Sequence, residues 1–325
     1  MKSCPSLILS AVPAQVDWPM PRRKKGQAIS GWLILDKPSG LSSTQALGRV
    51  RWLLDAQKGG HGGTLDPLAT GVLPLAFGEA TKTLPFVLEK TKTYQFEVTF
   101  GAATTTADAE GEVTETSDTL PTQPEIEEVL PRFTGDIEQI PPAYSAIKID
   151  GERAYKKARS GEKVDLKPRQ VCVLRLELVQ YDTGRTLFEA EVSKGTYIRS
   201  LGVDMASALG SCGHITQLRR TKIGNMTLAN SLTLDEAEKK VAKAGGKGHI
   251  PANLLLPTDW VLDDIPALKV TAADAEKLMH GQNIPLPEAQ KGLLRAKTEE
   301  GSLLSLLEVA SDGSTTIVRN FNDIA

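Results

Sequence analysis

Short apolar runs alternate with glycine- and proline-rich breaks through the first part of the chain. The apolar run 31–35 predicts a buried strand, and the leucine and valine spacing after Ser42 or Ser43 predicts a helix with one apolar face. The run 72–77 is again typical of a buried strand. The stretch 60–71 lies between that helix and the second strand, so we expect rigid elements to hold it from both sides.

Apolar and polar residues alternate with period two in several later segments, which is the pattern of half-buried strands. Helical segments are expected between these strands. The expected strands are 92–100, 144–149, 171–179, 187–192 and 214–223, and the expected helical segments are 79–88, 124–133, 152–160 and one that follows 195–199 and ends near 210. This mixture predicts an α+β fold.

The composition changes after Lys239, and a linker rich in glycine and lysine occupies 244–248. Beyond it the pattern predicts one short helix and a few short strands, so 256–325 is expected to be a small β-rich domain. Small β-barrels often bind RNA, and a purely structural role fits the sequence equally well. The main domain is expected to be 31–250.

The N-terminal part contains a short apolar run that prolines interrupt, followed by a basic cluster, so 1–30 is expected to be a flexible extension rather than an export signal. No apolar run is long enough to span a membrane. Cys4, Cys172 and Cys212 show no Cys-x-x-Cys spacing. This argues against a structural metal site or a disulfide framework, and favours a cytoplasmic protein.

Charge is distributed unevenly, although the 325-residue chain has a formal net charge of only −2. Between residues 148 and 175 there are nine Lys or Arg and four Asp or Glu, whereas 108–128 holds eight acidic residues and no basic one. A basic segment in a near-neutral protein is typical of a local contact with a polyanion. A solvated helix face would explain the same charges.

The stretch 60–71 combines four glycines and one histidine with a single carboxylate, Asp66. Glycine permits positive φ and close backbone approach, and Pro67 restricts Asp66 to extended conformations. A carboxylate on a stiff loop beside a buried strand is a common way to present a nucleophile or general base. An ordinary Asp-Pro turn explains the same residues. The spacing fits neither a phosphate-binding loop nor a dinucleotide-binding motif.

Two further side chains are candidates for chemistry, each with an ordinary alternative. Tyr94 lies on the apolar face of the strand expected at 92–100, where it could equally be a core aromatic. Arg199 follows Gly195 at an expected strand-to-helix corner. A side chain there can reach back over a sheet, although a surface arginine would also fit.

Several motifs occur in a fixed order: GWLILDKP at 31–38, HGGTLDPLATG at 61–71, KTY at 92–94, TxTxDxxG at 104–111, QIPPxYSA at 139–146, KGTYIR at 194–199 and LRR at 218–220. Together they resemble the bacterial TruB family, whose members are tRNA pseudouridine synthases that act on uridine 55 of the T-loop. The resemblance extends over residues 31–240 and leaves 1–30 outside it. Thr105 stands where the family often has Asp.

The resemblance implies a pseudouridine synthase fold, with a central mixed, largely antiparallel sheet flanked by helices and a small β-rich, PUA-like domain over 256–325. It implies that Asp66, Tyr94 and Arg199 are the catalytic residues. Asp66 would be the nucleophile that attacks either C1′ of the ribose or C6 of the base, and Arg199 would keep its carboxylate ionised and aimed. Tyr94 would stack on the uracil and help to remove the C5 proton.

The resemblance also implies how tRNA binds. The target base would be flipped out, with Leu218 as the apolar wall opposite Tyr94 and His61 stacked in the vacated space. Lys37 and Pro38 would support the active-site loop. A basic insertion at about 140–170 would close over the T-stem-loop through phosphate contacts; its candidate residues are Lys148, Lys156, Lys157 and Arg159. No cofactor or metal ion is expected, and the protein is expected to be a monomer.

Two other classes of function stay open. One is a non-catalytic RNA-binding or RNA-remodelling protein on the same scaffold, which would be expected to lack the set of Asp66, Tyr94 and Arg199. The other is a guide-RNA-dependent pseudouridine synthase, which needs partner proteins for activity. Reaction of the purified protein with tRNA alone would separate a stand-alone enzyme from both.

Overall fold

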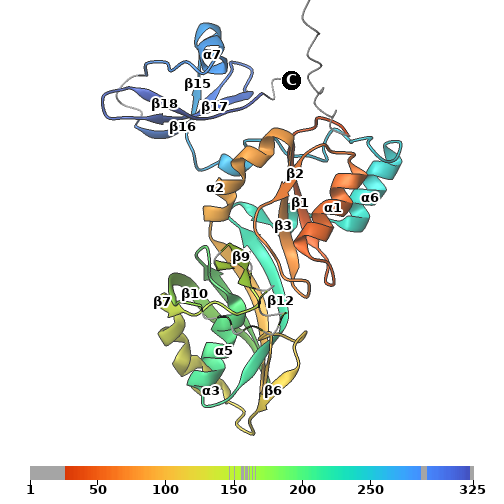
Figure 1. Ribbon diagram of the computed structural model, residues 1–325, viewed down its shortest axis with the longest axis vertical. Helices are drawn as coiled ribbons and strands as arrows, with labels where there is room; N and C mark the ends of the chain where they lie inside the picture. The colour runs from red at the N-terminus through yellow and green to blue at the C-terminus, as the bar shows by residue number, and fades with distance from the viewer. Residues whose placement is uncertain are drawn as a thin grey trace, which may run out of the picture.

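The computed structural model describes residues 26–286 and 291–322, except residues 146, 150, 155, 156, 158, 159, 161, 163 and 165. Within these residues, ten strands form one large sheet and four later strands form a small sheet near the C-terminus. Figure 1 shows the small sheet beyond one end of the large one. The predicted α+β fold with a separate small C-terminal sheet domain is confirmed.

The elements have the following bounds. The large sheet contains β1 (Gly31–Lys37), β2 (Gly59–His61), β3 (Thr70–Phe77), β4 (Lys92–Phe100), β7 (Gly135–Gln139), β10 (Arg169–Asp182), β11 (Arg185–Val192), β12 (Gly213–Ile223), β13 (Met226–Thr227) and β14 (Leu232–Thr233). Two hairpins are formed by β5 (Ala102–Thr104) with β6 (Val113–Thr116), and by β8 (Lys148–Ile149) with β9 (Glu152–Arg153). The small sheet contains β15 (Ala267–Lys269), β16 (Gly292–Lys297), β17 (Leu303–Val309) and β18 (Thr315–Asn320). The α-helices are α1 (Ser43–Leu53), α2 (Leu84–Glu89), α3 (Gln123–Val129), α5 (Ile198–Ala208), α6 (Leu234–Lys243) and α7 (Ala272–Met279).

The large sheet is mixed and largely antiparallel, as the family resemblance implied. Its order is β14-β1-β3-β12-β4-β11-β10-β7, with β2 bonded to β3 and β13 to β12. The pairs β1–β14 and β3–β12 are parallel, and the other pairs are antiparallel. Strand β12 therefore lies between β3, which follows the stretch 60–71, and β4, which carries Tyr94. Residues far apart in sequence meet at this point of the sheet.

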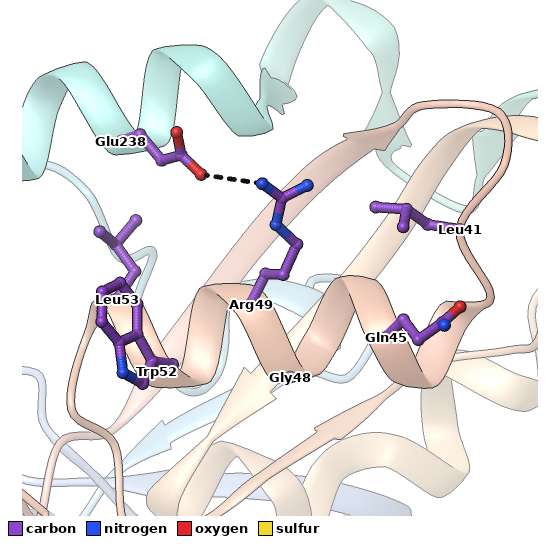
Figure 2. A pocket seen from close by; sticks show the side chains of 7 residues that line it. All are labelled: Leu41, Gln45, Gly48, Arg49, Trp52, Leu53 and Glu238. Carbon is purple, nitrogen blue, oxygen red and sulfur yellow. Dashed lines mark ion pairs between the residues drawn. The ribbon is translucent and has the colours of Figure 1, made fainter.

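Helix α1 starts at a capping box built on Ser42. The Ser42 hydroxyl accepts a hydrogen bond from the Gln45 amide at 3.2 Å, and the Gln45 side chain accepts one from the Ser42 amide at 2.9 Å. Helices α1 and α6 lie side by side (Figure 1), and Arg49 of α1 forms an ion pair with Glu238 of α6 at 3.7 Å (Figure 2). The two helices cover the sheet near β1. Because Ser42 caps α1, the Ser43 hydroxyl is available for other hydrogen bonds.

The two sheets share one apolar cluster. Trp32 of β1, Leu262, Leu306 of β17 and Phe321 are all buried and belong to this cluster. The Trp32 indole also donates a hydrogen bond to the carbonyl of Thr258 at 3.2 Å. The small C-terminal domain is therefore packed onto the main domain through core contacts, not only through the linker.

The helical segment expected at 79–88 is confirmed as a 3-10 helix (Gly78–Thr83) followed by α2; Pro85 in the first turn of α2 has no amide hydrogen and favours a new helix start. Two other local predictions were wrong. The strand expected at 144–149 is reduced to β8, and the helical turn expected from residue 152 begins as strand β9. Gly151, with φ of 86°, turns the chain between these two strands. Residues 1–25 of the predicted extension lie outside the described residues.

None of the helices in the described part of the chain is both long and apolar enough to cross a membrane.

Candidate active site

The loop that carries Asp66 is held by its backbone on both sides. The Gly62 amide donates to the carbonyl of Pro74 in β3 at 2.8 Å. The buried Ser43 hydroxyl accepts a hydrogen bond from the Leu65 amide at 2.7 Å and donates one to the Leu65 carbonyl at 3.0 Å. The Leu65 side chain is buried in the main core. The backbone is thus fixed at Leu65, one residue before Asp66.

Lys37 supports the other side of this loop. Its fully buried ammonium donates to the carbonyl of Leu41 at 2.6 Å, of Pro38 at 2.8 Å and of Pro67 at 3.3 Å. Burial lowers the pKa of Lys37 to about 8, so the group is still mostly protonated at neutral pH. The loop after Asp66 is therefore bound by a buried cation through backbone oxygens.

Arg199 lies directly against Asp66. Its Nε is 2.9 Å from Asp66 Oδ2. This contact is an ion pair; the guanidinium also donates two hydrogen bonds, from Nη1 to the Thr106 carbonyl and from Nη2 to the Tyr144 carbonyl, each 2.9 Å long. Arg199 is 4% exposed, whereas the Asp66 side chain is 35% exposed. A rigid buried guanidinium therefore aims a carboxylate that is still open to solvent on one side.

A second carboxylate, Asp108, completes this ion-pair network. Its Oδ2 lies 3.6 Å from Arg199 Nη1, and the residue is 3% exposed. Asp108 Oδ1 also accepts hydrogen bonds from the Thr106 hydroxyl and from the Glu110 amide. The sequence motif at 104–111 contained Asp108, but gave no indication that it would share the guanidinium with Asp66.

The pKa of the Asp66 carboxyl is raised above its ordinary value of 3.8. Burial is the largest cause; the Arg199 charge opposes it, and the nearby Asp108 charge adds to it. We expected Arg199 to keep Asp66 ionised. Its charge does act in that direction, but burial outweighs it. The carboxylate is consequently more basic than an exposed one, which suits a nucleophile or a base.

Tyr94 and Leu218 lie on adjacent strands of the sheet. Tyr94 of β4 is half-buried and pairs with Arg220 of β12. Leu218 is 7% exposed and pairs with Phe96. His61 is the last residue of β2, pairs with Leu75 and immediately precedes the loop that carries Asp66. His61 thus leads into the loop, whereas Leu218 and Tyr94 come from β12 and β4, the next two strands of the sheet after β3.

Two residues near the site had no assigned role in the sequence. Arg220 is 1% exposed and donates to the carbonyls of Gly63 and Thr64 in the loop. Tyr197 lies close enough for the charges of Arg199 and Asp66 to act on its hydroxyl, whose pKa burial raises. Arg220 belongs to the LRR motif and Tyr197 to the KGTYIR motif. Membership of these motifs was the only sequence signal that could have suggested a role for them.

The candidate phosphate-binding residues are only partly described. Lys148 belongs to β8, and Lys157 is half-buried, with its carbonyl accepting a hydrogen bond from the Ser160 hydroxyl at 2.8 Å. Lys156 and Arg159 lie outside the described residues. Their contact with RNA stays a prediction.

Two other features do not belong to this site. A cavity of about 520 Å³ between α1 and α6 contains none of the candidate catalytic side chains (Figure 2); it is lined by Leu41, Gln45, Gly48, Arg49, Trp52, Leu53 and Glu238. In the part of the chain that the structure describes, no group of three or more His, Cys, Asp or Glu side chains is placed to hold a metal ion.

Comparisons with known proteins identify the family. Residues 51–198 match the model of the TruB family pseudouridylate synthase N-terminal domain, and residues 199–263 match the tRNA pseudouridylate synthase B C-terminal domain. Proteins named tRNA pseudouridine synthase B are similar over most of their length. The one from Caulobacter vibrioides is 49% identical, covering 87% of this chain and 90% of its own, and the one from Bradyrhizobium diazoefficiens is 50% identical, covering 92% and 88%.

Solved structures share the fold at lower identity. A chain of a Cbf5-Nop10-Gar1 complex is 24% identical with a TM-score of 0.68, covering 89% of this chain and 84% of its own. A chain of an H/ACA RNP bound to a substrate RNA containing 2′-deoxyuridine is 22% identical with a TM-score of 0.67, covering 90% and 84%. Sequence and fold agree: the chain belongs to the TruB family of pseudouridylate synthases.

Proposed function

We propose that this protein is a stand-alone tRNA pseudouridine synthase that isomerises uridine 55 in the T-loop, with Asp66 as the nucleophile. The observation that carries the proposal is the Asp66 carboxylate, partly open to solvent and held 2.9 Å from the buried guanidinium of Arg199. The curated relatives named tRNA pseudouridine synthase B support tRNA as the substrate.

The reaction is redox-neutral. The bond between ribose C1′ and uracil N1 breaks, the base turns, and a bond forms between C1′ and C5. The hydrogen on C5 leaves as a proton, and N1 gains a proton. One group must hold part of the substrate while the other part rotates, and a carboxylate can do this by forming an ester with C1′ or an adduct at C6. The position of Asp66 is compatible with either attack.

Arg199 acts on this step by keeping the carboxylate oriented. Its Nε forms the ion pair with Asp66, and Nη1 and Nη2 donate hydrogen bonds to the carbonyls of Thr106 and Tyr144. A guanidinium held in this way cannot turn away from Asp66, so the carboxylate is organised before substrate arrives. The raised pKa of Asp66 makes its ionised form a stronger base and nucleophile.

The remaining residues bind the flipped base and the RNA. Tyr94 stacks on the uracil and assists removal of the C5 proton, and Leu218 forms the opposite wall. Extrusion of the base costs a few kcal/mol, and His61 offsets part of this cost by stacking in the vacated space. The basic segment around Lys157 contacts phosphates of the T-stem-loop.

Two alternative functions are less well supported. A protein that only binds RNA would have no use for a buried Arg199 aimed at an accessible carboxylate. The likeness to chains of the Cbf5-Nop10-Gar1 complex and of the H/ACA RNP, at 24% and 22% identity, concerns the fold alone and gives the guide-dependent class no support. The relatives at about half identity carry the name of the tRNA enzyme instead.

The test uses a T-stem-loop RNA labelled with tritium at C5 of the target uridine. The wild-type protein alone should release tritium to water. Asp66→Asn preserves the shape of the loop and removes the charge, so release should become undetectable while RNA affinity changes by less than about tenfold. The exposed Asp118→Asn is the matched control and should behave as wild type.

Each result has a separate meaning. Release by a folded Asp66→Asn protein would exclude Asp66 as the nucleophile. No release by wild type on unmodified RNA would exclude a stand-alone enzyme for this substrate, and activity that returned with a guide RNA and partner proteins would favour the guide-dependent class.

A further inference from the structure

A buried arginine, Arg220, lies between the catalytic loop and Tyr94. It is 1% exposed and belongs to β12. Its backbone pairs with Gly71 of β3 on one side and with Tyr94 of β4 on the other. The strand after the loop and the strand carrying the aromatic residue therefore meet at Arg220.

The Arg220 side chain reaches back into the loop ahead of Asp66. Its Nε donates to the Val72 carbonyl at 2.8 Å, Nη2 to the Gly63 carbonyl at 3.1 Å, and Nη1 to the Thr64 carbonyl at 3.4 Å. Two of these acceptors lie two and three residues before Asp66. The guanidinium thus fixes the entry to the loop, as the Lys37 ammonium fixes its exit at Pro67.

The same guanidinium contacts Tyr94. Nη1 lies 3.5 Å from the Tyr94 hydroxyl, and the guanidinium carbon lies 6.0 Å from the centre of its ring. One planar group therefore sets the distance between the loop and the aromatic ring. A lysine has one nitrogen at the end of a flexible stem, and it could not make these bonds in three directions.

Arg220 is not neutralised in the way that Arg199 is. Among the described residues, the ion pairs do not include Arg220, and its hydrogen-bond partners are three carbonyls and one hydroxyl. A buried charge without a carboxylate is costly unless polar groups surround it. A neutral residue could have filled this space at lower cost, so its bonds to the loop and to Tyr94 point to a role in the reaction.

On the basis of the function proposed above, we propose that Arg220 is a positioning residue that holds the Asp66 loop and Tyr94 at the separation that the reaction requires. It acts through these two groups and does not touch the substrate. Its loss should slow the chemical step and leave RNA binding nearly unchanged. A residue needed only for stability would not separate the two quantities.

The neighbouring Arg219 provides a matched control. It belongs to the same strand, but its guanidinium forms an ion pair with Asp36 at 2.7 Å and donates to the Thr70 hydroxyl at 3.2 Å. Arg220→Lys and Arg219→Lys make the same chemical change one residue apart. Arg220→Ala and Arg219→Ala form a second matched pair. In each, removal of the side chain leaves space in which added guanidinium can bind.

The experiment measures single-turnover tritium release with enzyme in excess, together with RNA affinity and the thermal midpoint. Arg220→Lys should lose about 100-fold in rate, with affinity within about threefold of wild type. Arg219→Lys should stay within about threefold in both. Guanidinium at low millimolar concentration should restore part of the Arg220→Ala rate, and should not change that of Arg219→Ala.

The possible results are distinct. A folded Arg220→Lys protein with a rate within about threefold of wild type would overturn the proposal, and so would equal losses in rate and affinity. If neither Arg220 variant folds, the residue serves folding and the proposal is also overturned. An inactive wild-type protein would instead reject the proposed function, and this proposal with it.

Discussion

Replacement of Arg199 by lysine tests how much the ion pair with Asp66 contributes to turnover. Arginine presents Nε to Asp66 at 2.9 Å and two further nitrogens to the carbonyls of Thr106 and Tyr144. Lysine keeps the positive charge but has one nitrogen, so it can approach either Asp66 or the carbonyls in a good geometry. The variant thus separates the effect of charge from the effect of orientation.

The expected loss follows from the hydrogen bonds at stake. A hydrogen bond to a charged group contributes about 1.5–3 kcal/mol, and one to a carbonyl about 0.5–1.5 kcal/mol. The ion pair with Asp66, taken at the value for a charged hydrogen bond, would if lost alone slow the chemical step by about 10- to 150-fold. With one buried carbonyl also left without its donor, the total of about 2–4.5 kcal/mol predicts a loss of about 30- to 2,000-fold in Arg199→Lys.

The assay is single-turnover tritium release from T-stem-loop RNA at saturating enzyme, so that weaker binding does not enter the rate. Arg295→Lys is the matched control, because Arg295 also donates to a carboxylate, Asp259 at 3.2 Å, and to a carbonyl, Ile265 at 2.7 Å. Both variants should lose some thermal stability. Only Arg199→Lys should lose rate, since Arg295 lies in the small C-terminal domain.

A folded Arg199→Lys protein that reacts within about twofold of wild type would refute this reasoning. It would mean that a diffuse positive charge near Asp66 is sufficient. A comparable loss of rate in Arg295→Lys would instead show that the assay reports stability.

Two further predictions concern salt and pH. Replacing Lys156, Lys157 and Arg159 with alanine should weaken tRNA binding. The slope of log affinity against log salt should become shallower by about 0.7–0.9 for each phosphate that the protein no longer neutralises. An unchanged slope in binding titrations would exclude this segment from the interface. Burial raises the pKa of Asp66, and in the proposed mechanism its ionised form is the nucleophile. The single-turnover rate should therefore fall as pH decreases through a value above 3.8, which a pH–rate profile at saturating enzyme would show or contradict. For stability the same shift acts in the opposite direction: a carboxyl with a raised pKa in the folded state favours folding at acid pH and loses that contribution as pH rises.

Much of the fold could be predicted because its signals are local. The capping box at Ser42, the alternation in β10 and β11 and the apolar run of β3 each depend on residues within one segment. The helical segment at 79–88 was predicted as well, but not its division into a 3-10 helix and α2 near Pro85. The hairpin of β8 and β9 was partly missed because strands of two residues leave almost no periodic pattern.

The chemistry of the site was less predictable than its location. Asp66 stood out as the single carboxylate of a glycine-rich stretch, whereas Asp108 was one of several acidic residues in a segment rich in them. Arg220 bonds to carbonyls more than 140 residues away, at Val72 and Gly63. Any residue can supply a backbone carbonyl as an acceptor, so no pattern of side chains in the sequence reveals these hydrogen bonds.

The shared apolar cluster between the two sheets limits how the domains can move. Swinging the small domain away would expose parts of Leu262, Leu306 and Phe321, which are at most 1% exposed. Exposing a fully buried side chain of this size costs about 1.5–3 kcal/mol. Exposing about half of each would cost roughly 2–4.5 kcal/mol in total, which keeps an open hinge at about one molecule in thirty or fewer. The shared cluster therefore holds the two domains as one body, and their relative arrangement is set before any ligand binds.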